Sequence, residues 1–315
     1  MNRAFPAIVA GLAIVAASYA QQAPSKPVAE ESVDPNRIVL DVTRVNMLFT
    51  VADKKGRFVT DLGKADFEIV ENKKPQNILE FTAESNLPLR LAILVDTSNS
   101  IRERFRFEQE AAVEFIDSLM RPEDKAVVVS FDTAAELVAD LTSETAKLSK
   151  AIRDLRPGGG TALYDAIFFA CRDKLMQDQP RHKFRRAMVV ISDGEDNQSR
   201  YTRDQALEMA QKADVVMYSI STNSMSAKAG QETDGDKVMR YFARETGGLA
   251  FFPFKVQDMA QSFENIANEL RHQYNVLYRP EPLKTDGQWH PIEIRVKGRK
   301  DLAVRARKGY YAPRM

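Results

Sequence analysis

Oxygen-bearing side chains alternate in the segment VDTSNS, residues 95–100, where an apolar run ends. A carboxylate at Asp96 and hydroxyls at Ser98 and Ser100 occupy every second position of what reads as one tight turn. Side chains in that arrangement can direct three oxygens at one centre. Such oxygens suit a hard cation, Mg²⁺, Ca²⁺ or Mn²⁺, rather than zinc. The segment therefore predicts part of a metal site.

Two later segments offer further oxygen ligands beside glycines. GGGT, residues 158–161, precedes a helical pattern, and ISDGED, residues 191–196, follows a strand pattern. The glycines permit close approach of the backbone, and Thr161 and Asp193 supply the oxygens. Each segment alone is explained equally well by a helix N-cap or a turn. Three of them in this order favour a metal site.

Apolar segments alternate with amphipathic ones over residues 87–273. LRLAILVD, AVVVSF, RAMVVISD and VVMYSIS have the uninterrupted apolar character of strands buried on both faces of a parallel sheet. Segments between them, such as RFEQEAAVEFIDSLM, have the period of amphipathic helices. We therefore predict a doubly wound, mostly parallel α/β domain over these residues. The three oxygen-bearing segments fall at the carboxyl edge of its sheet, where open α/β sheets bind ligands.

The flanking segments, residues 38–86 and 274–315, have a different pattern. Short runs of alternating apolar and polar residues, such as IVLDVTRVNMLFTV and HPIEIRVK, are separated by turn residues and predict antiparallel strands. About four strands fit into the first segment, too few to close a sandwich alone. We predict that the two segments pair into one small β-sandwich into which the α/β domain is inserted. Two unrelated β tails are the alternative.

The N-terminus predicts export. A positive charge at Arg3, an apolar run from Phe5 to Ala17 and small residues near Ala20 are typical of a cleaved secretory signal peptide, residues 1–20. An uncleaved membrane anchor is the alternative, but the run is shorter than the ~20 residues that span a bilayer. Residues 21–37, rich in Pro, Ser and charge, predict a linker. We expect a mature chain without a membrane span, either periplasmic or secreted.

Composition narrows the classes of function. With 45 basic and 44 acidic residues the net charge is +1, so no global field attracts nucleic acid or an anionic membrane. The sole cysteine, Cys171, lies within a predicted helix and predicts no disulfide. The histidines, His182, His272 and His290, have no metal-ligand spacing, and neither a nucleophile elbow nor a G-x-x-x-x-G-K-[ST] loop occurs. The loop at residues 158–161, before a helix, could cradle a phosphate but lacks the third glycine of the dinucleotide fingerprint. We expect a binding protein and not an enzyme.

The three loops together resemble those of a known site. DTSNS, GGGTAL and VVISDGED look like the metal-ion-dependent adhesion site (MIDAS) of von Willebrand factor type A (VWA) domains, and the order of elements agrees from Leu89 to about Arg271. The whole chain is also similar to the VWFA-related proteins abundant in Acidobacteria. The resemblance implies a bacterial interaction or adhesion module. Its implied metal ligands are Asp96, Ser98, Ser100, Thr161 and Asp193.

Coordination chemistry suggests how such a site would bind a partner. Mg²⁺, the expected cation, takes about six oxygens, so two aspartates and three hydroxyls leave at least one position to water. The family mode of adhesion implies that an exposed Asp or Glu of a partner protein takes that position. A structural role in envelope assembly, in which the metal only stabilises the loops, is the alternative.

Residues near the three loops carry further expectations. Asp132 and Asp165 are candidate outer partners of the metal ligands, or ordinary surface charges, whereas Glu195 and Asp196 are expected to be solvated. The polar segment at residues 222–236 follows a strand at the same edge and is either a disordered loop or a partner-selecting one. Its candidate selecting residues are Thr222, Asn223, Glu232, Asp234 and Asp236.

Overall fold

The computed structural model describes residues 44–83, 87–99, 105–178, 183–223, 232–253 and 256–314. All of them lie in a unit that spans Val39–Met315. The predicted signal peptide, the linker and Ser100 lie outside the described residues. Within the described ranges, we find no helix whose length and apolar character would suit a membrane span.

The α/β region is built on one sheet whose four central strands are buried and whose two edge strands are partly exposed. Its strands are β5 (Leu89–Asp96), β6 (Lys125–Phe131), β7 (Ala135–Thr142), β8 (Arg185–Ser192), β9 (Val215–Ser221) and β10 (Ala250–Phe251). Their order among the described strands is β10-β9-β8-β5-β6-β7, and every pairing is parallel except that of β7 with β6. Every residue of β5 and β8 is buried, as the uninterrupted apolar sequences predicted.

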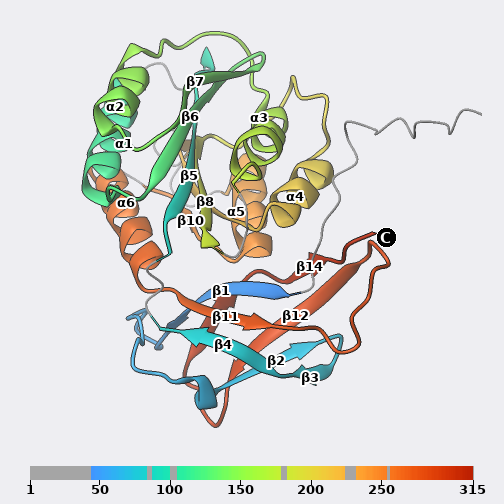
Figure 1. The fold of residues 1–315 in the computed structure, drawn as a ribbon. Helices are drawn as coiled ribbons and strands as arrows, with labels where there is room; N and C mark the ends of the chain where they lie inside the picture. Colours follow the sequence, from blue (N-terminus) through green and yellow to red (C-terminus); the bar gives the residue numbers. More distant parts are fainter. Residues whose placement is uncertain are drawn as a thin grey trace, which may run out of the picture. The chain divides into compact units, whose positions relative to one another are not determined.

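Helices cover both faces of this sheet (Figure 1). On one face lie α1 (Phe105–Leu119), α2 (Thr145–Asp154) and α6 (Val256–Arg271), and on the other lie α3 (Leu163–Phe169), α4 (Arg203–Lys212) and α5 (Asp234–Thr246). The chain continues from α3 into a π-helical segment, η3 (Ala170–Leu175). Thr202 and Thr233 cap α4 and α5 through capping boxes. The predicted doubly wound fold is confirmed.

Strands from both ends of the described chain form the sandwich. The N-terminal segment supplies β1 (Val45–Ala52), a 3₁₀ turn η1 (Lys64–Asp66), β2 (Phe67–Glu71), β3 (Lys74–Gln76) and β4 (Ile78–Thr82). The C-terminal segment supplies β11 (Tyr274–Tyr278), β12 (Trp289–Val296), β13 (Ala303–Ala306) and β14 (Gly309–Tyr311). The two antiparallel sheets have the orders β13-β1-β11-β4 and β14-β12-β2-β3. Each sheet combines strands from both segments, so the prediction of an insertion into one sandwich is confirmed.

Aromatic rings fill the space between these two sheets. Phe49 of β1 lies 5.0 Å from Phe67 of β2 and 5.4 Å from Tyr274 of β11, measured between ring centroids. Such pairs stabilise a core beyond the burial of their area. The alternation predicted from sequence is seen in β2, where Phe67 and Ile69 face this core.

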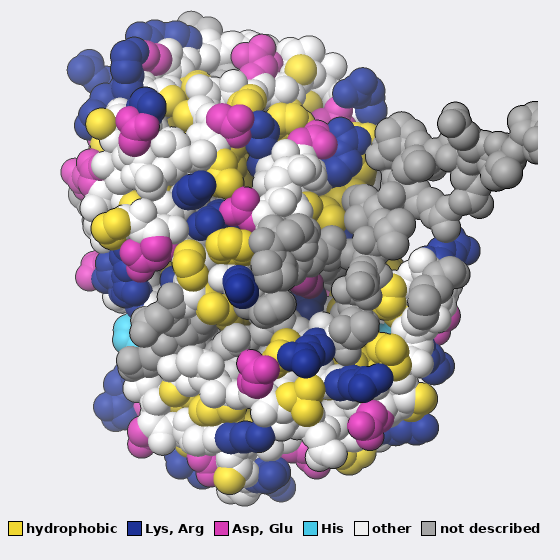
Figure 2. Space-filling model, in the orientation of Figure 1, with side chains coloured by type: hydrophobic (Ala, Val, Ile, Leu, Met, Phe, Trp, Pro, Cys, Tyr) yellow, Lys and Arg dark blue, Asp and Glu magenta, His cyan; other side chains and the backbone are white. Residues whose placement is uncertain are grey.

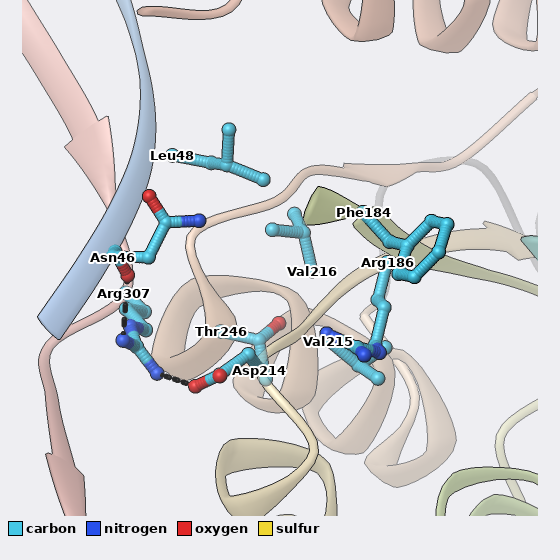
Figure 3. Close-up of a pocket in the computed structure, with 9 residues that line it drawn as sticks. All are labelled: Asn46, Leu48, Phe184, Arg186, Asp214, Val215, Val216, Thr246 and Arg307. Atoms are coloured by element: carbon cyan, nitrogen blue, oxygen red, sulfur yellow. Dashed lines mark hydrogen bonds and ion pairs between the residues drawn. The ribbon is translucent and has the colours of Figure 1, made fainter. Parts of the chain in front are cut away.

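Ion pairs fasten the sandwich to the α/β region. Arg305 of β13 donates to both carboxylate oxygens of Glu269 in α6, at 3.2 and 3.0 Å, and Thr50 of β1 donates to the same carboxylate at 3.1 Å. Arg307 pairs with Asp214, which precedes β9 (Figure 3). The junction encloses a cavity of about 20 Å³, room for about one water molecule. Its lining residues are Asn46, Leu48, Phe184, Arg186, Asp214, Val215, Val216, Thr246 and Arg307 (Figure 3).

Candidate metal centre

The first predicted loop starts at the end of β5, in the middle of the sheet. Asp96 is fully buried; its Oδ1 accepts the backbone N–H of Ser98 at 2.8 Å and its Oδ2 accepts the hydroxyl of Ser192 at 2.6 Å. Burial raises the pKa of Asp96 to about 6, the hydrogen bonds from Ser192 and Ser98 oppose this rise, and the nearby charge of Asp193 adds to it. None of these groups is cationic. Asp96 is therefore a buried carboxylate for which no positive charge of the described chain compensates.

The second loop packs directly on the first. Gly158 donates its backbone N–H to the carbonyl of Thr97 at 2.6 Å, and Asn99 donates its side-chain amide to the carbonyl of Gly159 at 3.3 Å. Gly159 has a left-handed φ of 76°, and a Cβ there would lie 2.7 Å from the Thr133 hydroxyl and 2.9 Å from the Asp132 carboxylate. This position therefore requires glycine.

Thr161, at the end of the second loop, is held from both sides. Its backbone N–H donates to Asn197 Oδ1 at 3.0 Å, and its carbonyl accepts the backbone N–H groups of Asn197 and Gln198 at 3.0 and 3.1 Å. Its side chain is 4% exposed, yet its hydroxyl forms no hydrogen bond with the described residues. A hydroxyl without a hydrogen bond to the described residues retains the capacity to bind a further group.

The third loop follows β8 and contains Asp193, which is 7% exposed. Gly194 has a left-handed φ of 77°, and a Cβ on it would lie 2.3 Å from the carbonyl oxygen of Gly235. Asn223 donates its side-chain amide to the carbonyl of Asp193. The loop is thus fixed against the N-terminus of α5 by backbone contacts that only glycine at Gly194 and Gly235 permits.

The parallel register explains why the three loops meet. Asp96 pairs with Phe131 of β6, and Val95 pairs with Ile191 of β8, so β5 and β8 end at one edge of the sheet. The structure brings Asp96, Ser98, Thr161 and Asp193 to this edge, all of them buried. Their role as metal ligands remains a prediction, as does that of Ser100.

The two candidate outer partners have different surroundings. Asp165 accepts the backbone N–H groups of Arg200 and Tyr201 at 2.9 and 3.0 Å and so ties the chain that follows the third loop to α3. Asp132 lies against Gly159 of the second loop. Asp196, expected to be solvated, is half-buried and accepts the backbone N–H of Tyr164 at 3.1 Å. That contact satisfies a free N–H in the first turn of α3.

The residues proposed to select a partner fall into two groups. Thr222 and Asp236 are 2% and 5% exposed, and Asp236 accepts the Ser221 hydroxyl at 2.6 Å, so both belong to the buried part of the fold. Glu232 and Asp234 are exposed and pair with Arg240 and Lys237 of α5 at 3.0 and 2.8 Å. Asn223, as described above, holds Asp193.

The sequence did not single out three supporting residues. Ser192 orients Asp96, Asn197 holds Thr161, and Gly235 allows the third loop to pack on α5. Ser192 is the one with a visible signal, because it is a polar residue at the end of an apolar strand and directly precedes Asp193.

The donor set fits a hard cation. Two buried carboxylates, one of them without a cationic neighbour, lie at one edge with a hydroxyl that has no hydrogen bond in the described part of the chain. Within that part, no group of three or more His, Cys, Asp or Glu side chains forms a metal site. A site of two carboxylates and several hydroxyls is of another type, and it matches the oxygen preference of Mg²⁺.

Comparison with known proteins shows what the α/β region is similar to. Residues 91–195 match the family model of the von Willebrand factor type A domain. An uncharacterised protein of Borreliella burgdorferi is 24% identical over an alignment of 212 residues, and the match covers 58% of this chain and 60% of that protein. The present chain thus spans less than two thirds of this relative.

Solved structures show the same fold at low sequence identity. A von Willebrand factor type A protein from Catenulispora acidiphila has a TM-score of 0.50 and 13% identity, over 88% of this chain and 75% of that chain. Proximal thread matrix protein 1 from the mussel byssus has a TM-score of 0.51 and 14% identity, over 64% of this chain and 51% of that chain. A second structure of the mussel protein, with a TM-score of 0.50, has a zinc-occupied MIDAS motif. Residues 91–195 are thus similar in sequence to the von Willebrand factor type A domain, and the doubly wound sheet around them has the fold of the solved von Willebrand factor type A structure.

Proposed function

We propose that this chain is an exported bacterial interaction module that captures an acidic side chain of a partner protein through a divalent cation. The cation, Mg²⁺ in the first instance and Mn²⁺ or Ca²⁺ as alternatives, would be held by Asp96, Ser98, Ser100, Thr161 and Asp193. The observation that carries the proposal is the buried Asp96 carboxylate, which accepts hydrogen bonds from Ser192 and Ser98 and whose pKa burial raises to about 6, with no cationic group of the described chain to oppose the rise.

A bound cation would supply the missing positive charge. When bound, it offers a partner carboxylate an electrophilic coordination position. The residues of this chain then have separate tasks: Ser192 and the Ser98 backbone orient Asp96, and Asn197 and Gln198 hold Thr161 in place. The zinc-occupied motif of the mussel protein supports a divalent cation at the corresponding loops.

The packing of the loops favours a binding role over a purely structural one. The third loop is already held by the contact of Gly194 with Gly235 and by Asn223, and the second loop is held by Thr97 and Asn197. Loops fixed by the chain itself do not need a metal to define their conformation. In the alternative, the metal raises stability without affecting partner capture.

Two further parts of the proposal have their own support. Export is proposed from the pattern of residues 1–20. A binding rather than a catalytic role is proposed because the described histidines have structural contacts away from the metal edge. His272 stacks on Phe58, and His290 forms a hydrogen bond with Glu71 in the sandwich.

Affinity capture tests the function. The immobilised protein would be exposed to envelope extract of the source bacterium in Mg²⁺ and in chelator, next to Asp96→Ala and the matched control Asp140→Asn, whose side chain is 68% exposed on β7. We expect a partner that the wild-type protein and the control retain in Mg²⁺ and that both chelator and Asp96→Ala release. A partner retained equally under all conditions would refute metal-dependent capture. Stabilisation by Mg²⁺ without any Mg²⁺-dependent partner would favour the structural alternative.

A further inference from the structure

The chain is nearly neutral overall, but its charged residues are unevenly distributed along the sequence. Residues 87–273 contain 25 basic and 29 acidic residues, a net charge of −4. Residues 274–315 contain ten basic and four acidic residues, a net charge of +6. Figure 2 shows Lys and Arg side chains, with apolar side chains between them, over the lower part of the view, where the sandwich strands lie. Positive charge concentrated on one domain points to an anionic ligand.

This charge lines a groove beside β13. The groove has a volume of about 960 Å³, and its cationic side chains are Lys54, Arg295, Lys297, Arg299, Lys300 and Lys308. Apolar side chains, including Val296, Leu302 and Val304, lie between them. We define these residues as the basic groove.

The acidic residues of the basic groove are engaged by its arginines. Arg295 pairs with Glu293 at 2.5 Å, and Arg299 pairs with Asp301 at 2.9 Å. The exposed Lys54, Lys300 and Lys308 have no ion pair within the described part of the chain. Three lysines are therefore available to an incoming anion.

A second pocket continues the groove on the side of α5. It has a volume of about 240 Å³ and shares Val304 and Lys308 with the basic groove. Arg240, Arg244 and Arg305 also line it, and none of its lining residues is acidic. The three arginines are paired with Glu232, Glu245 and Glu269, so among the described residues the free cation of this pocket is Lys308. Because they share Val304 and Lys308, the two depressions form one continuous track beside β13.

The backbone beside this track is open to pairing. Among the described strands β13 pairs only with β1, so it is an edge strand, and β10, at the edge of the other sheet, borders the same pocket. An edge strand presents unpaired N–H and C=O groups to which an extended peptide can add. Gly247 packs on the backbone of Ala306 and Arg307 and limits the open part of β13 to its first residues.

The residues that line the two depressions favour some classes of anionic ligand over others. Single-stranded nucleic acids bind where aromatic side chains stack on bases, and neither depression has an aromatic lining residue. A planar membrane surface does not enter a concave track. We propose that the basic groove and the adjoining pocket bind an extended acidic peptide, which pairs with the free edge of β13 and places its carboxylates on Lys54, Lys300 and Lys308. This site is separate from the metal centre and needs no metal.

The test uses the full chain in chelator, so that the metal centre does not contribute. The probe is a fluorescein-labelled peptide of alternating glutamate and threonine, followed by fluorescence anisotropy. We expect binding that weakens at high salt and a dissociation constant at least roughly tenfold higher for Lys300→Glu/Lys308→Glu, because like charges then face each other. The matched control is Lys73→Glu/Lys74→Glu, with the same charge change on exposed sandwich residues outside the groove, and it should retain wild-type affinity. Lys54→Glu/Lys300→Glu repeats the test at a second pair.

Each remaining result decides the proposal. A probe with alternate N-methylated amides keeps its charge but cannot complete a β ladder, so weaker binding supports strand addition and equal affinity refutes it. Equal losses in the groove variant and the control would show a net-charge effect and would overturn the site. So would binding that Asp96→Ala abolishes, or lysine-dependent binding of oligothymidylate or phosphatidylglycerol vesicles in place of the peptide.

Discussion

Buried carboxylates occur both at the metal edge of the α/β region and where the sandwich begins, but their surroundings differ. Glu269 in α6, whose side chain is 1% exposed, is met by the guanidinium of Arg305 and the hydroxyl of Thr50. Burial raises its pKa, whereas the charge and hydrogen bonds of Arg305 lower it. Asp96 is equally buried, but its hydrogen-bond donors are the Ser192 hydroxyl and the Ser98 backbone N–H. The nearby charge is a second carboxylate, that of Asp193, and raises the pKa of Asp96 further.

The difference separates structural from functional carboxylates in this chain. A buried charge is costly unless it is paired. Glu269 is paired by the chain itself, so it joins two regions. Asp96 is not paired in this way, so its charge is available to an external cation. The following predictions test this distinction, beginning with the largest expected effect.

Removing the internal partner should be the most damaging change. Arg305→Ala leaves Glu269 with Thr50 alone, and we expect it to lower the free energy of unfolding by about 3 kcal/mol, because an unpaired buried charge remains. Urea unfolding of the purified variant measures this loss. Replacing both partners, as in Glu269→Leu/Arg305→Leu, should restore most of it. A loss in the double variant as large as in Arg305→Ala would show that the pairing is not what matters.

Loop packing at the metal edge gives the next effect. Gly235→Ala places a Cβ 2.1 Å from the carbonyl oxygen of Asp193, so the third loop must move. We expect a loss of stability of about 2 kcal/mol, typical of overpacking, together with weaker Mg²⁺ binding. Calorimetric titration and thermal unfolding measure the two effects. Gly63→Ala controls for the added methyl group alone, because Gly63 has a negative φ and its new Cβ would meet only Asp66 Oδ2, at 3.8 Å.

Metal binding itself should stabilise both regions together. At a free Mg²⁺ concentration of a hundred times Kd we expect a gain of about 2.7 kcal/mol. The single cysteine and the single tryptophan monitor the unfolding of the two regions separately. Cys171 is buried in the α/β region, where burial also raises the pKa of its thiol, and Trp289 lies in the sandwich. Because Arg305 and Arg307 join the regions, thiol labelling and tryptophan fluorescence should shift by the same amount. A shift in the cysteine signal alone would mean that the regions unfold independently.

The smallest effect concerns Asp96 without metal. In chelator, Asp96→Asn should raise the free energy of unfolding by about 1 kcal/mol, because it removes a buried charge and keeps the shape of the side chain. In Mg²⁺ the sign should reverse, since the variant gains nothing from the cation. Paired denaturation curves with and without Mg²⁺ measure both. A variant less stable than wild type in chelator would contradict the description of Asp96 as an uncompensated charge.

Local patterns were sufficient to predict most of the fold. The uninterrupted apolar runs predicted β5, β6, β8 and β9, and the alternating runs predicted the strands of the sandwich. The edge strand β7 was not predicted, because half-burial at a sheet edge gives Ala135–Thr142 no clear period. The run LAVRARKGYYA forms two strands in different sheets: β13 pairs with β1, and β14 pairs with β12. Gly309, the first residue of β14, packs directly on the carbonyl of His290 in β12.

The candidate site was predictable only where its residues lie in short motifs. Asp96, Thr161 and Asp193 follow strands or precede helices beside glycines, so their positions carry a local signal. The contacts of Gly194 with Gly235 and of Asn223 with Asp193 join residues that are distant in the sequence. Nothing in the sequence near either partner indicates such a contact. For the same reason Thr222 and Asp236 could not be recognised beforehand as buried residues.

Calorimetric titration of Mg²⁺ into chelator-treated protein tests the central claim most directly. For the wild-type protein and for the control Asp140→Asn we predict binding of about one ion per chain, with no detectable binding to Asp96→Ala. Thr161→Ala should bind more weakly than wild type. A wild-type protein that binds no divalent cation, or an Asp96→Ala variant that binds as well as wild type, would contradict the account.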